Sequence, residues 1–423
     1  MPEKIITAID LGSSQISVVI ATLNENKKFE IKGFAATEAK GIENGLVKDL
    51  QKASESISAA VNQANKKAEV EIDNLFVAIS GQHIISKDAI GRISIANDSQ
   101  PCEIDETHIT SVINDAKNTV KMNSASEKLE ILDWIPQVYE IDNQIGIINP
   151  IGMSGFSMKV HLKVIQAELN HIRNIRKALE MVFPKKEPRI VVGTLAAAEV
   201  VTNEDERRLG CAIIDIGEGT TDIIIYQKSF FISYVCIPKG GSLISHDLAV
   251  GLRTPPTNAE DIKIEHGNAL PATVSSDKII DVEGIGGRPA QKRALTWISQ
   301  LTQTRAKEII DTSYKVILAE FPALDMLTAG VVLTGGTALL ANIQFLVEDP
   351  QGFNLPCKIA YPDCKGISGA ISQLDSPRYS SLVGLLNYAV KYGKIENNVS
   401  GKSIIPGHVF QKIKDSFKKI IDI

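Results

Sequence analysis

One pattern of apolar and polar residues occurs twice in this chain. Residues 9–20 and 214–225 each run apolar, Asp, apolar, Gly, then several mostly polar residues, then three β-branched ones. Two apolar strands joined by a polar turn with glycine are typical of a β-hairpin. Two such hairpins about two hundred residues apart predict a duplicated α/β architecture.

The segments between the hairpins predict helices and an inserted subdomain. Apolar residues at helical spacing over 51–68 and 168–183 predict two helices that cover a sheet. The stretch from about 83 to 163 has strands and a polar helix of its own, which we interpret as an inserted subdomain. These strands and this helix are expected at 92–96, 158–165 and near 105–122.

After the second hairpin the pattern predicts a long helix, a buried strand and a linker. The helix is expected from about Gln291 to Glu320, and the strand over 331–333. That strand stops in Gly335 and Gly336, and paired glycines before a helix invite a ligand onto the helix N-terminus. Residues 391–407 have the glycine, asparagine and proline content of a flexible linker.

Composition narrows the class of protein. A chain of 423 residues with 44% hydrophobic and 22% charged side chains can bury two or three cores. A formal net charge of −5 provides no basic field for phosphate backbones, so we expect no nucleic-acid partner. The five cysteines are widely spread and form no metal-binding spacing, which predicts free thiols. No stretch approaches the roughly 18 apolar residues of a membrane span, so we expect a cytoplasmic protein.

The turns of the two hairpins carry candidate phosphate ligands. Glycines admit a close approach of the backbone N–H groups to a phosphate, and hydroxyls add donors. Asp10 and Asp215 stand at strand ends, where carboxylates can hold the waters of a Mg²⁺ ion. One such turn alone is equally well an ordinary tight turn with an Asp cap, but the pair and the third glycine turn together predict a nucleotide site. The predicted nucleotide-site residues are Gly12, Ser13, Ser14, Gln15, Gly217, Gly219, Thr220 and Thr221 on the phosphate side, and Gly335 and Gly336 in the third turn.

With these motifs the chain resembles the actin-like ATPase superfamily and, more closely, the FtsA family of bacterial cell-division proteins. The superfamily's two phosphate hairpins and its adenosine motif fit residues 10–15, 215–222 and 333–337. The most specific resemblance lies in TPPTNAEDIKIEHGNAL at 254–270 and in GIGGRP at 284–289. The resemblance covers essentially the whole chain and implies ATP with Mg²⁺ as ligand. It also implies that Glu260 and Lys263 face the adenosine and that Gly240 and Gly241 lie near the phosphates.

The same resemblance implies an α/β, actin-like (ribonuclease-H-like) duplicated fold with an inserted subdomain and a C-terminal amphipathic helix. The 226–300 region is the expected site for the tubulin-like FtsZ. The implied parts are a first core at 1–83, 163–192 and 376–390, the inserted subdomain at 84–162, a second core at 193–225 and 301–375, a second subdomain at 226–300, a linker at 391–407 and a membrane-targeting helix at 408–423.

Two residues depart from the family pattern. Gln15 stands where members commonly carry a lysine, and it donates only a neutral hydrogen bond to a phosphate. Glu218 stands where related proteins often have a small residue, and its carboxylate would repel a triphosphate. We therefore predict weak nucleotide affinity or slow turnover, at most a slow ATPase and no metabolic enzyme.

The last sixteen residues predict a helix that lies on a membrane. Their apolar side chains fall within an arc of about 120°, flanked by lysines that can reach anionic headgroups. A helix of this length spans about 24 Å, enough to lie on a bilayer but hardly to cross it. The alternative is an amphipathic helix docked on the protein body or in a partner groove. The predicted membrane-binding residues are Phe410, Lys412, Ile413, Lys414, Phe417, Lys418, Lys419, Ile420 and Ile421.

The function implied by the resemblance is cell division. The protein would anchor FtsZ filaments at the cytoplasmic face of the inner membrane as a peripheral protein at the division site. It would assemble with itself and recruit later division proteins. The alternatives are an actin-like pilus-assembly protein, or an ATPase or kinase of the same superfold, although no nucleophile and base pair is evident in the sequence.

Overall fold

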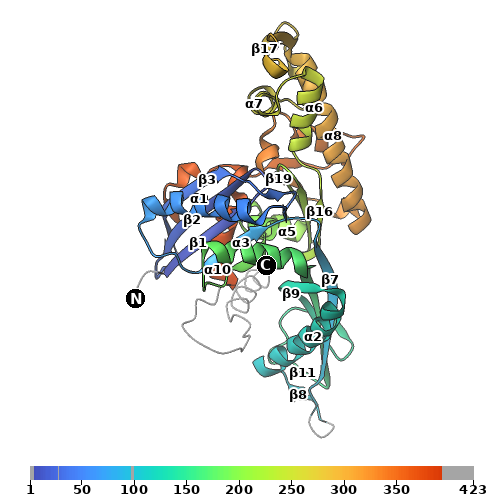
Figure 1. Cartoon of the computed structure of the whole chain (residues 1–423). Coiled ribbons are helices and arrows are strands. Elements are labelled where there is room, and N and C mark those ends of the chain that lie inside the picture. Colours follow the sequence, from blue (N-terminus) through green and yellow to red (C-terminus); the bar gives the residue numbers. More distant parts are fainter. Residues whose placement is uncertain (1–3, 27, 97–99, 393–423) are drawn as a thin grey trace. The chain divides into compact units, whose positions relative to one another are not determined.

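The computed structural model describes residues 4–26, 28–96 and 100–392 (Figure 1). The described residues form two compact units. The first takes those within Met1–Gln82 and Asn174–Leu386, and the second those within His83–Arg173 and Asn387–Ile423. The predicted membrane helix, with every predicted membrane-binding residue, lies outside the described residues. So does the predicted linker, except for residues 391 and 392, which instead end helix α10 (Ser380–Tyr392).

The first unit contains a six-stranded mixed sheet in the order β13-β6-β1-β2-β3-β21. Strand β1 pairs antiparallel with β2, and β2 with β3, whereas β6 and β13 run parallel to β1. The predicted first hairpin is thus confirmed. The strands are β1 (Lys4–Leu11), β2 (Gln15–Leu23), β3 (Phe29–Glu38), β6 (Leu75–Ile79), β13 (Arg189–Val192) and β21 (Ile367–Gly369).

A five-stranded sheet in the same unit repeats this topology in the order β16-β15-β14-β19-β20. Strands β14, β15 and β16 pair antiparallel in sequence, and β19 and β20 follow parallel to β14. Its five strands match β3, β2, β1, β6 and β13 one for one, so the predicted duplication is confirmed. They are β14 (Cys211–Ile216), β15 (Thr221–Gln227), β16 (Phe230–Ile237), β19 (Gly330–Thr334) and β20 (Cys357–Ile359).

The edge strand β21 has no counterpart in the second sheet. Residues 367–369 pair with Phe29–Ile31 of β3 and so lie in the first sheet, although they fall within the range predicted for the second core. Three residues carry too little pattern to be assigned to a sheet from sequence, because any exposed strand edge can accept them.

Helices cover the sheets, and α1 (Leu50–Ala68) shows how the sequence sets their packing. Asp49 accepts a hydrogen bond from the Lys52 backbone N–H and caps the helix start. The buried face recurs every three or four residues, and a Cβ on Gly33 of β3 would lie 2.1 Å from the Ala64 carbonyl oxygen. Only glycine therefore allows this close approach. The other helices beside the sheets are α3 (Leu169–Val182), α4 (Gly193–Val201), α5 (Glu204–Leu209), α9 (Gln344–Val347) and α10 (Ser380–Tyr392).

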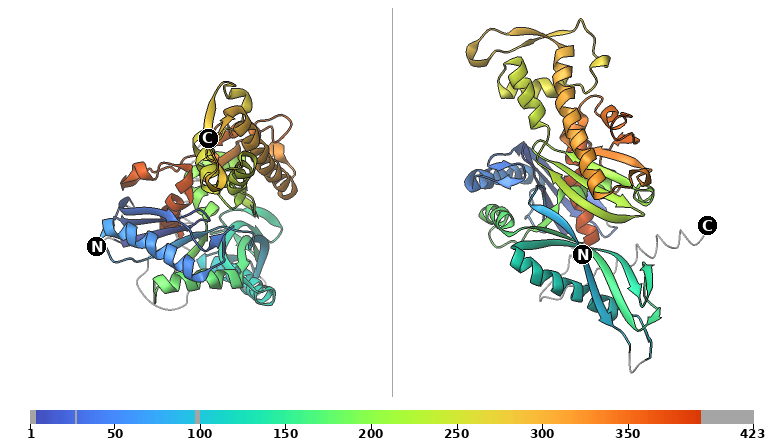
Figure 2. Two further views of the ribbon diagram at one scale, coloured as in Figure 1. Left: turned by 45° about the horizontal axis from the view of Figure 1, so that its top comes forward. Right: turned by 90° about the vertical axis from the view of Figure 1, so that its right-hand side faces the viewer.

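A mostly helical subdomain follows β16, with α6 and α7 lying beside the long helix α8 (Figure 2). The long helix begins at Leu295 and not at Gln291 as predicted, because residues 291–294 pair with 279–282 in a two-stranded ribbon. Its elements are α6 (Ser242–Leu252), α7 (Pro256–His266), β17 (Ile279–Val282), β18 (Gln291–Ala294) and α8 (Leu295–Glu320).

The second unit is built on a four-stranded antiparallel sheet in the order β10-β9-β12-β7, with helix α2 packed on one face. Helix α2 buries Ile109, Val112 and Ala116 in its core. The strand predicted at 92–96 instead begins at Ile84 and ends at Ser94, since exposed Lys87 and Asp88 hid its first half in the pattern. The elements are β7 (Ile84–Ser94), β8 (Cys102–Glu103), α2 (Glu106–Glu127), β9 (Leu129–Ile141), β10 (Gln144–Ile147), β11 (Ser154–Gly155) and β12 (Ser157–Glu168).

No helix in the described part of the chain is long and apolar enough to cross a membrane.

Candidate functional site

The turns of the two hairpins meet at one pocket within the first unit. Most of the predicted nucleotide residues line it, whereas Thr221, Gly240 and Gly241 do not. The predicted residues along the wall are Asp10, Gly12, Ser13, Ser14, Gln15, Asp215, Gly217, Gly219, Thr220, Glu260, Lys263, Gly335 and Gly336, and Glu218 is with them.

The first turn joins β1 to β2 and is supported from behind by a small hairpin. A Cβ on Gly12 would lie 2.7 Å from the Gln15 carbonyl oxygen, so the tight turn requires glycine. The Ser13 hydroxyl oxygen accepts a hydrogen bond from the Gly45 N–H at 3.4 Å. Gly45 and Asn44 have positive φ angles of 75° and 49° in the two-residue turn between β4 (Ile42–Glu43) and β5 (Leu46–Val47). Asn-Gly is the preferred sequence for such a turn.

The second turn joins β14 to β15 and touches the first half directly. The Gly217 N–H donates to the Thr220 carbonyl oxygen at 2.9 Å, which closes the turn. A Cβ on Gly219 would lie 2.6 Å from Asn44 Oδ1 and 2.8 Å from Ser13 Oγ, so a larger residue here would displace these two side chains. The two halves therefore approach each other closely at Gly219.

Three buried carboxylates lie at the bottom of the pocket. Burial, with the Asp222 charge added, raises the pKa of Asp10 to about 7. Burial, then the charges of Asp222 and Asp10, raises the pKa of Asp215 to about 8. The pKa of Asp222 is also raised by burial, although hydrogen bonds to its carboxylate oppose the rise. A divalent cation beside these carboxylates would favour their ionised forms and so oppose the rise of their pKa values.

The donor atoms around Asp10 and Asp215 are oxygens, which fits Mg²⁺. Within the described residues no group of three or more His, Cys, Asp or Glu side chains is placed to hold a metal ion directly. Asp10 and Asp215, which were predicted to hold a magnesium ion through its waters, line the pocket together.

Asp222 and its partner Tyr234 were not predicted as site residues, whereas Thr220 was. The Tyr234 hydroxyl donates to Asp222 at 2.5 Å, and the Thr220 hydroxyl donates to it at 2.9 Å. Thr220 Oγ1 also lies 3.2 Å from the Ser80 hydroxyl of the first half. Asp222 therefore orients a side chain that faces both the pocket and the other half.

The far wall of the pocket is formed by α7. Lys263 donates to Glu260 at 2.7 Å and to the Gly241 carbonyl oxygen at 3.3 Å. Ser245 of α6 also donates to Glu260. Burial and the Glu260 charge raise the pKa of Glu218, and Lys263 partly offsets this. The predicted adenosine-side residues are thus brought together as one hydrogen-bonded group.

The loop between β16 and α6 supports the second turn from behind. The Gly241 N–H donates to the Gly217 carbonyl oxygen at 2.9 Å, and a Cβ on Gly240 would lie 2.3 Å from the Glu218 carbonyl oxygen. Both glycines therefore contact the turn and not the pocket.

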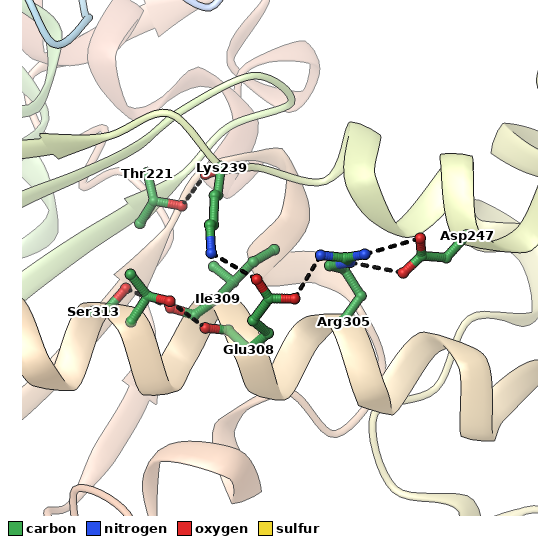
Figure 3. Close-up of polar contacts among 8 residues, drawn as sticks. Thr221, Lys239, Asp247, Arg305, Glu308, Ile309 and Ser313 are labelled. Carbon is green, nitrogen blue, oxygen red and sulfur yellow. Dashed lines mark hydrogen bonds and ion pairs between the residues drawn. The ribbon is translucent and has the colours of Figure 1, made fainter.

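Figure 3 shows how this loop is anchored to α6 and α8. The Thr221 hydroxyl donates to the Lys239 carbonyl oxygen at 2.7 Å, which explains why Thr221 faces away from the pocket. The Lys239 ammonium donates to Glu308 of α8 at 2.6 Å, and Arg305 bridges Glu308 and Asp247 of α6. A movement of α6 or α8 would therefore be transmitted through these contacts to the loop between β16 and α6.

The third turn differs from the prediction in one respect. Gly335 has a φ of 87°, and a Cβ there would lie 2.3 Å from Asp215 Oδ1. The expected helix after Gly336 is a single 3₁₀ turn, Gly336–Leu339, so there is no α-helix N-terminus to bind a ligand. The Thr337 hydroxyl instead donates to the Gly217 carbonyl oxygen at 2.9 Å and joins the second and third turns.

Several pocket residues were missed by sequence reasoning. Ser80 and Thr194 directly follow the parallel strands β6 and β13. Ligands bind at the carboxyl ends of such strands, and this signal could have found both. No local pattern indicates the others. The missed residues are Ile79, Ser80, Gly193, Thr194, Asp222, Ile264, Thr337, Arg378 and Ser381.

Comparison with known proteins identifies the family. The family profile "Cell division protein FtsA" matches residues 212–384, and "SHS2 domain inserted in FTSA" matches 81–166. The cell division protein FtsA of Neisseria meningitidis serogroup B (strain ATCC BAA-335 / MC58) is 32% identical over 394 residues, covering 92% of this chain and 91% of that protein. The chain belongs to the FtsA family. FtsA of Escherichia coli (strain K12) is 29% identical over 423 residues, covering 99% and 96% of the two chains.

Solved structures of low sequence identity share the fold of this chain. A type IV pilus biogenesis complex, PilM-PilN, matches with a TM-score of 0.61 at 12% identity, covering 91% of this chain and 98% of that one. MreB5 of Spiroplasma citri bound to ADP matches with a TM-score of 0.52 at 16% identity, covering 92% and 98%. The actin-like fold with an inserted subdomain, predicted from the sequence, is confirmed, and the insertion matches the SHS2 domain. The chain is a bacterial cell-division protein.

Proposed function

We propose that the chain binds ATP with Mg²⁺ and anchors FtsZ filaments to the inner face of the cytoplasmic membrane, where it recruits later division proteins. Membership of the FtsA family supports the division role. The observation that carries the nucleotide role is the single pocket lined by both hairpin turns and by Glu260 and Lys263.

The residues of the pocket suit the separate parts of a nucleotide. The backbone N–H groups and hydroxyls of Ser13, Ser14 and Thr220 suit phosphates. Asp10 and Asp215 would hold a magnesium ion through water, and that ion would screen the phosphate charge. Glu260 and Lys263 would bind the nucleoside. MreB5 of Spiroplasma citri, which shares this fold, has been solved with ADP and with AMPPNP.

Gln15 and Glu218 favour a slow nucleotide switch over rapid hydrolysis. Both side chains line the pocket, and neither provides positive charge. Gln15→Lys should therefore tighten ATP binding or speed turnover, because a cation would oppose the phosphates. Calorimetric titration with Mg-ATP and a phosphate-release assay check this, and equal affinities and rates in wild type and variant would contradict it.

A nucleotide held by both halves would favour the closed pocket and so would couple occupancy to self-assembly. FtsZ would bind within 226–300, the subdomain that carries α6, α7 and α8. The segment 408–423 would hold each subunit weakly on the lipid surface, and many such contacts along a filament would retain it by avidity.

Two experiments test the partner and membrane roles. A pull-down with the FtsZ C-terminal peptide should retain the full chain, whereas a pilus-assembly protein or a kinase of the same fold should not be retained. The likeness to the pilus complex, at 12% identity, extends to the fold alone, so it does not favour that alternative. Liposome flotation should recover the full chain and lose a chain ending at Gly407; identical recovery would contradict membrane binding.

A further inference from the structure

The charges that line the pocket are strongly unbalanced. Only two cationic side chains face five carboxylates along its wall. A nucleotide that enters is itself an anion, so each cation contributes more to its binding than in a neutral pocket. The carboxylates are Asp10, Asp215, Glu218, Asp222 and Glu260, and the cations are Lys263 and Arg378.

The two cations differ in what they already bind. The Lys263 ammonium is 11% exposed and is engaged by Glu260 and by the Gly241 carbonyl oxygen. The Arg378 side chain is exposed and makes no hydrogen bond or ion pair within the described residues. Arg378 is thus the pocket cation whose side chain no described residue engages in a hydrogen bond or ion pair.

Contacts of the two neighbouring residues fix the position of the backbone at Arg378. The Pro377 carbonyl oxygen accepts from the Gly335 N–H at 3.2 Å, and the Tyr379 ring packs edge-on against Phe34 at 5.2 Å between centroids. Arg378 Nε lies 3.6 Å from where a Cβ on Gly336 would stand. The guanidinium group therefore lies beside the third turn.

We infer that Arg378 contacts the phosphate groups of the bound nucleotide and supplies the positive charge that Gln15 lacks. This rests on the proposed nucleotide binding. A guanidinium offers several N–H donors in a plane and can bind two phosphate oxygens at once. The turn beside it, at Gly335, touches Asp215 and so lies toward the magnesium side of the pocket.

Three variants test this in the full chain. Arg378→Gln removes the charge, Arg378→Lys keeps it, and Arg208→Gln is the matched control, because Arg208 lies outside the pocket and pairs only with Asp205 among the described residues. Calorimetry with Mg-ADP should show about a tenfold loss of affinity for Arg378→Gln, about 1.4 kcal/mol. Arg378→Lys should lose much less, and Arg208→Gln should bind as wild type.

Adenosine serves as a second ligand in this experiment, because it carries no phosphate. All four proteins should bind it equally, and the tenfold loss with Mg-ADP should shrink in 0.5 M salt because salt screens an ionic contact. Equal Mg-ADP affinity of wild type and Arg378→Gln, or an equal loss with adenosine, would overturn the inference. If the wild type binds no Mg-ADP at all, the proposed nucleotide binding itself fails. Equal unfolding midpoints of the ligand-free proteins exclude misfolding.

Discussion

The two hairpins share their backbone pairing but differ in what they bury. In the first, Asp10 pairs across the strands with Ser17. In the second, Asp215 pairs with Asp222, so two acids stand opposite each other. Ser17 is 1% exposed and Asp222 is 3% exposed, which makes both positions equally buried. Like charges directly opposite are unfavourable in a sheet, and burial increases the cost.

The neighbouring strands show how the second hairpin tolerates its extra acid. Phe34 of β3 and Tyr234 of β16 occupy equivalent register positions, since Val19 pairs with the first and Ile224 with the second. Only the tyrosine carries a hydroxyl, and it donates to Asp222. The two sheets therefore share their topology, but only the second contains this buried acid together with a tyrosine hydroxyl that donates to it.

The largest effect is expected when a second acid is placed in the first hairpin, where no tyrosine hydroxyl can donate to it. Ser17→Asp would bury a carboxylate opposite Asp10 beside Phe34, which has no hydroxyl. We expect a loss of about 3 kcal/mol or more of unfolding free energy, as for an unpaired buried charge. Denaturant unfolding of the ligand-free protein measures it, with Ser17→Ala as the control. A loss no greater than that of Ser17→Ala would show that the first hairpin tolerates an acid unaided.

The converse change removes the donor and keeps the acid. Tyr234→Phe should cost about 1.5–3 kcal/mol, the value of a hydrogen bond to a charged group. The double variant Asp222→Ser with Tyr234→Phe copies the first hairpin. It should be less destabilised than Tyr234→Phe alone, because no buried acid is left without its tyrosine donor. Thermal unfolding of both variants tests this; additive losses would mean that the pair does not act as a unit.

A third change concerns the turns. Gly219→Ala would clash with Asn44 and Ser13 of the first half, whereas a Cβ on Gly217 would meet only the Thr220 carbonyl oxygen at 3.3 Å. We expect Gly219→Ala to lower stability by about 1–3 kcal/mol and Gly217→Ala by clearly less. Scanning calorimetry compares them. If Gly217→Ala lowered stability more than Gly219→Ala, the critical close contact would lie within the turn and not between the two halves.

The smallest effect is expected for the change in pH dependence when Asp222 of the second hairpin is replaced. The folded-state pKa values of Asp10 and Asp215 are raised to about 7 and about 8 from 3.8. The folded protein thus binds more protons than the unfolded chain between about pH 4 and 8, so this contribution to stability is lost as pH rises through that window.

Asp222→Asn removes one of the charges that raise the pKa values of Asp10 and Asp215, so it should make the unfolding free energy less dependent on pH. We expect this free energy to rise on the order of 1 kcal/mol at pH 8 and to change little at pH 5. Unfolding midpoints at both pH values, without magnesium or nucleotide, check this against Asp281→Asn on the exposed ribbon strand β17. A parallel shift at both pH values would contradict the assigned cause.

The sequence predicted those parts of the site that lie within one local pattern. The hairpins at Asp10 and Asp215 alternate or run apolar and turn at glycines, so their strands, their turns and their duplication could be inferred. The inserted subdomain was located for the same reason. Errors arose where the local signal was short or ambiguous, as in the four residues before Leu295 that pair with β17 and the 3₁₀ turn after Gly336.

By itself, therefore, the sequence determined which residues form the two hairpins, because period and turn chemistry are local properties of the chain. Only the tertiary structure decided which residues from distant parts of the chain lie next to these hairpins. Arg378 stands 363 positions after Gln15, yet both line one pocket, and Thr220 reaches Ser80 across 140 residues. Asp222 likewise lies in a strand that looks apolar in sequence, and only its pairing with Asp215 and its hydrogen bond from Tyr234 reveal a buried acid in a shared network.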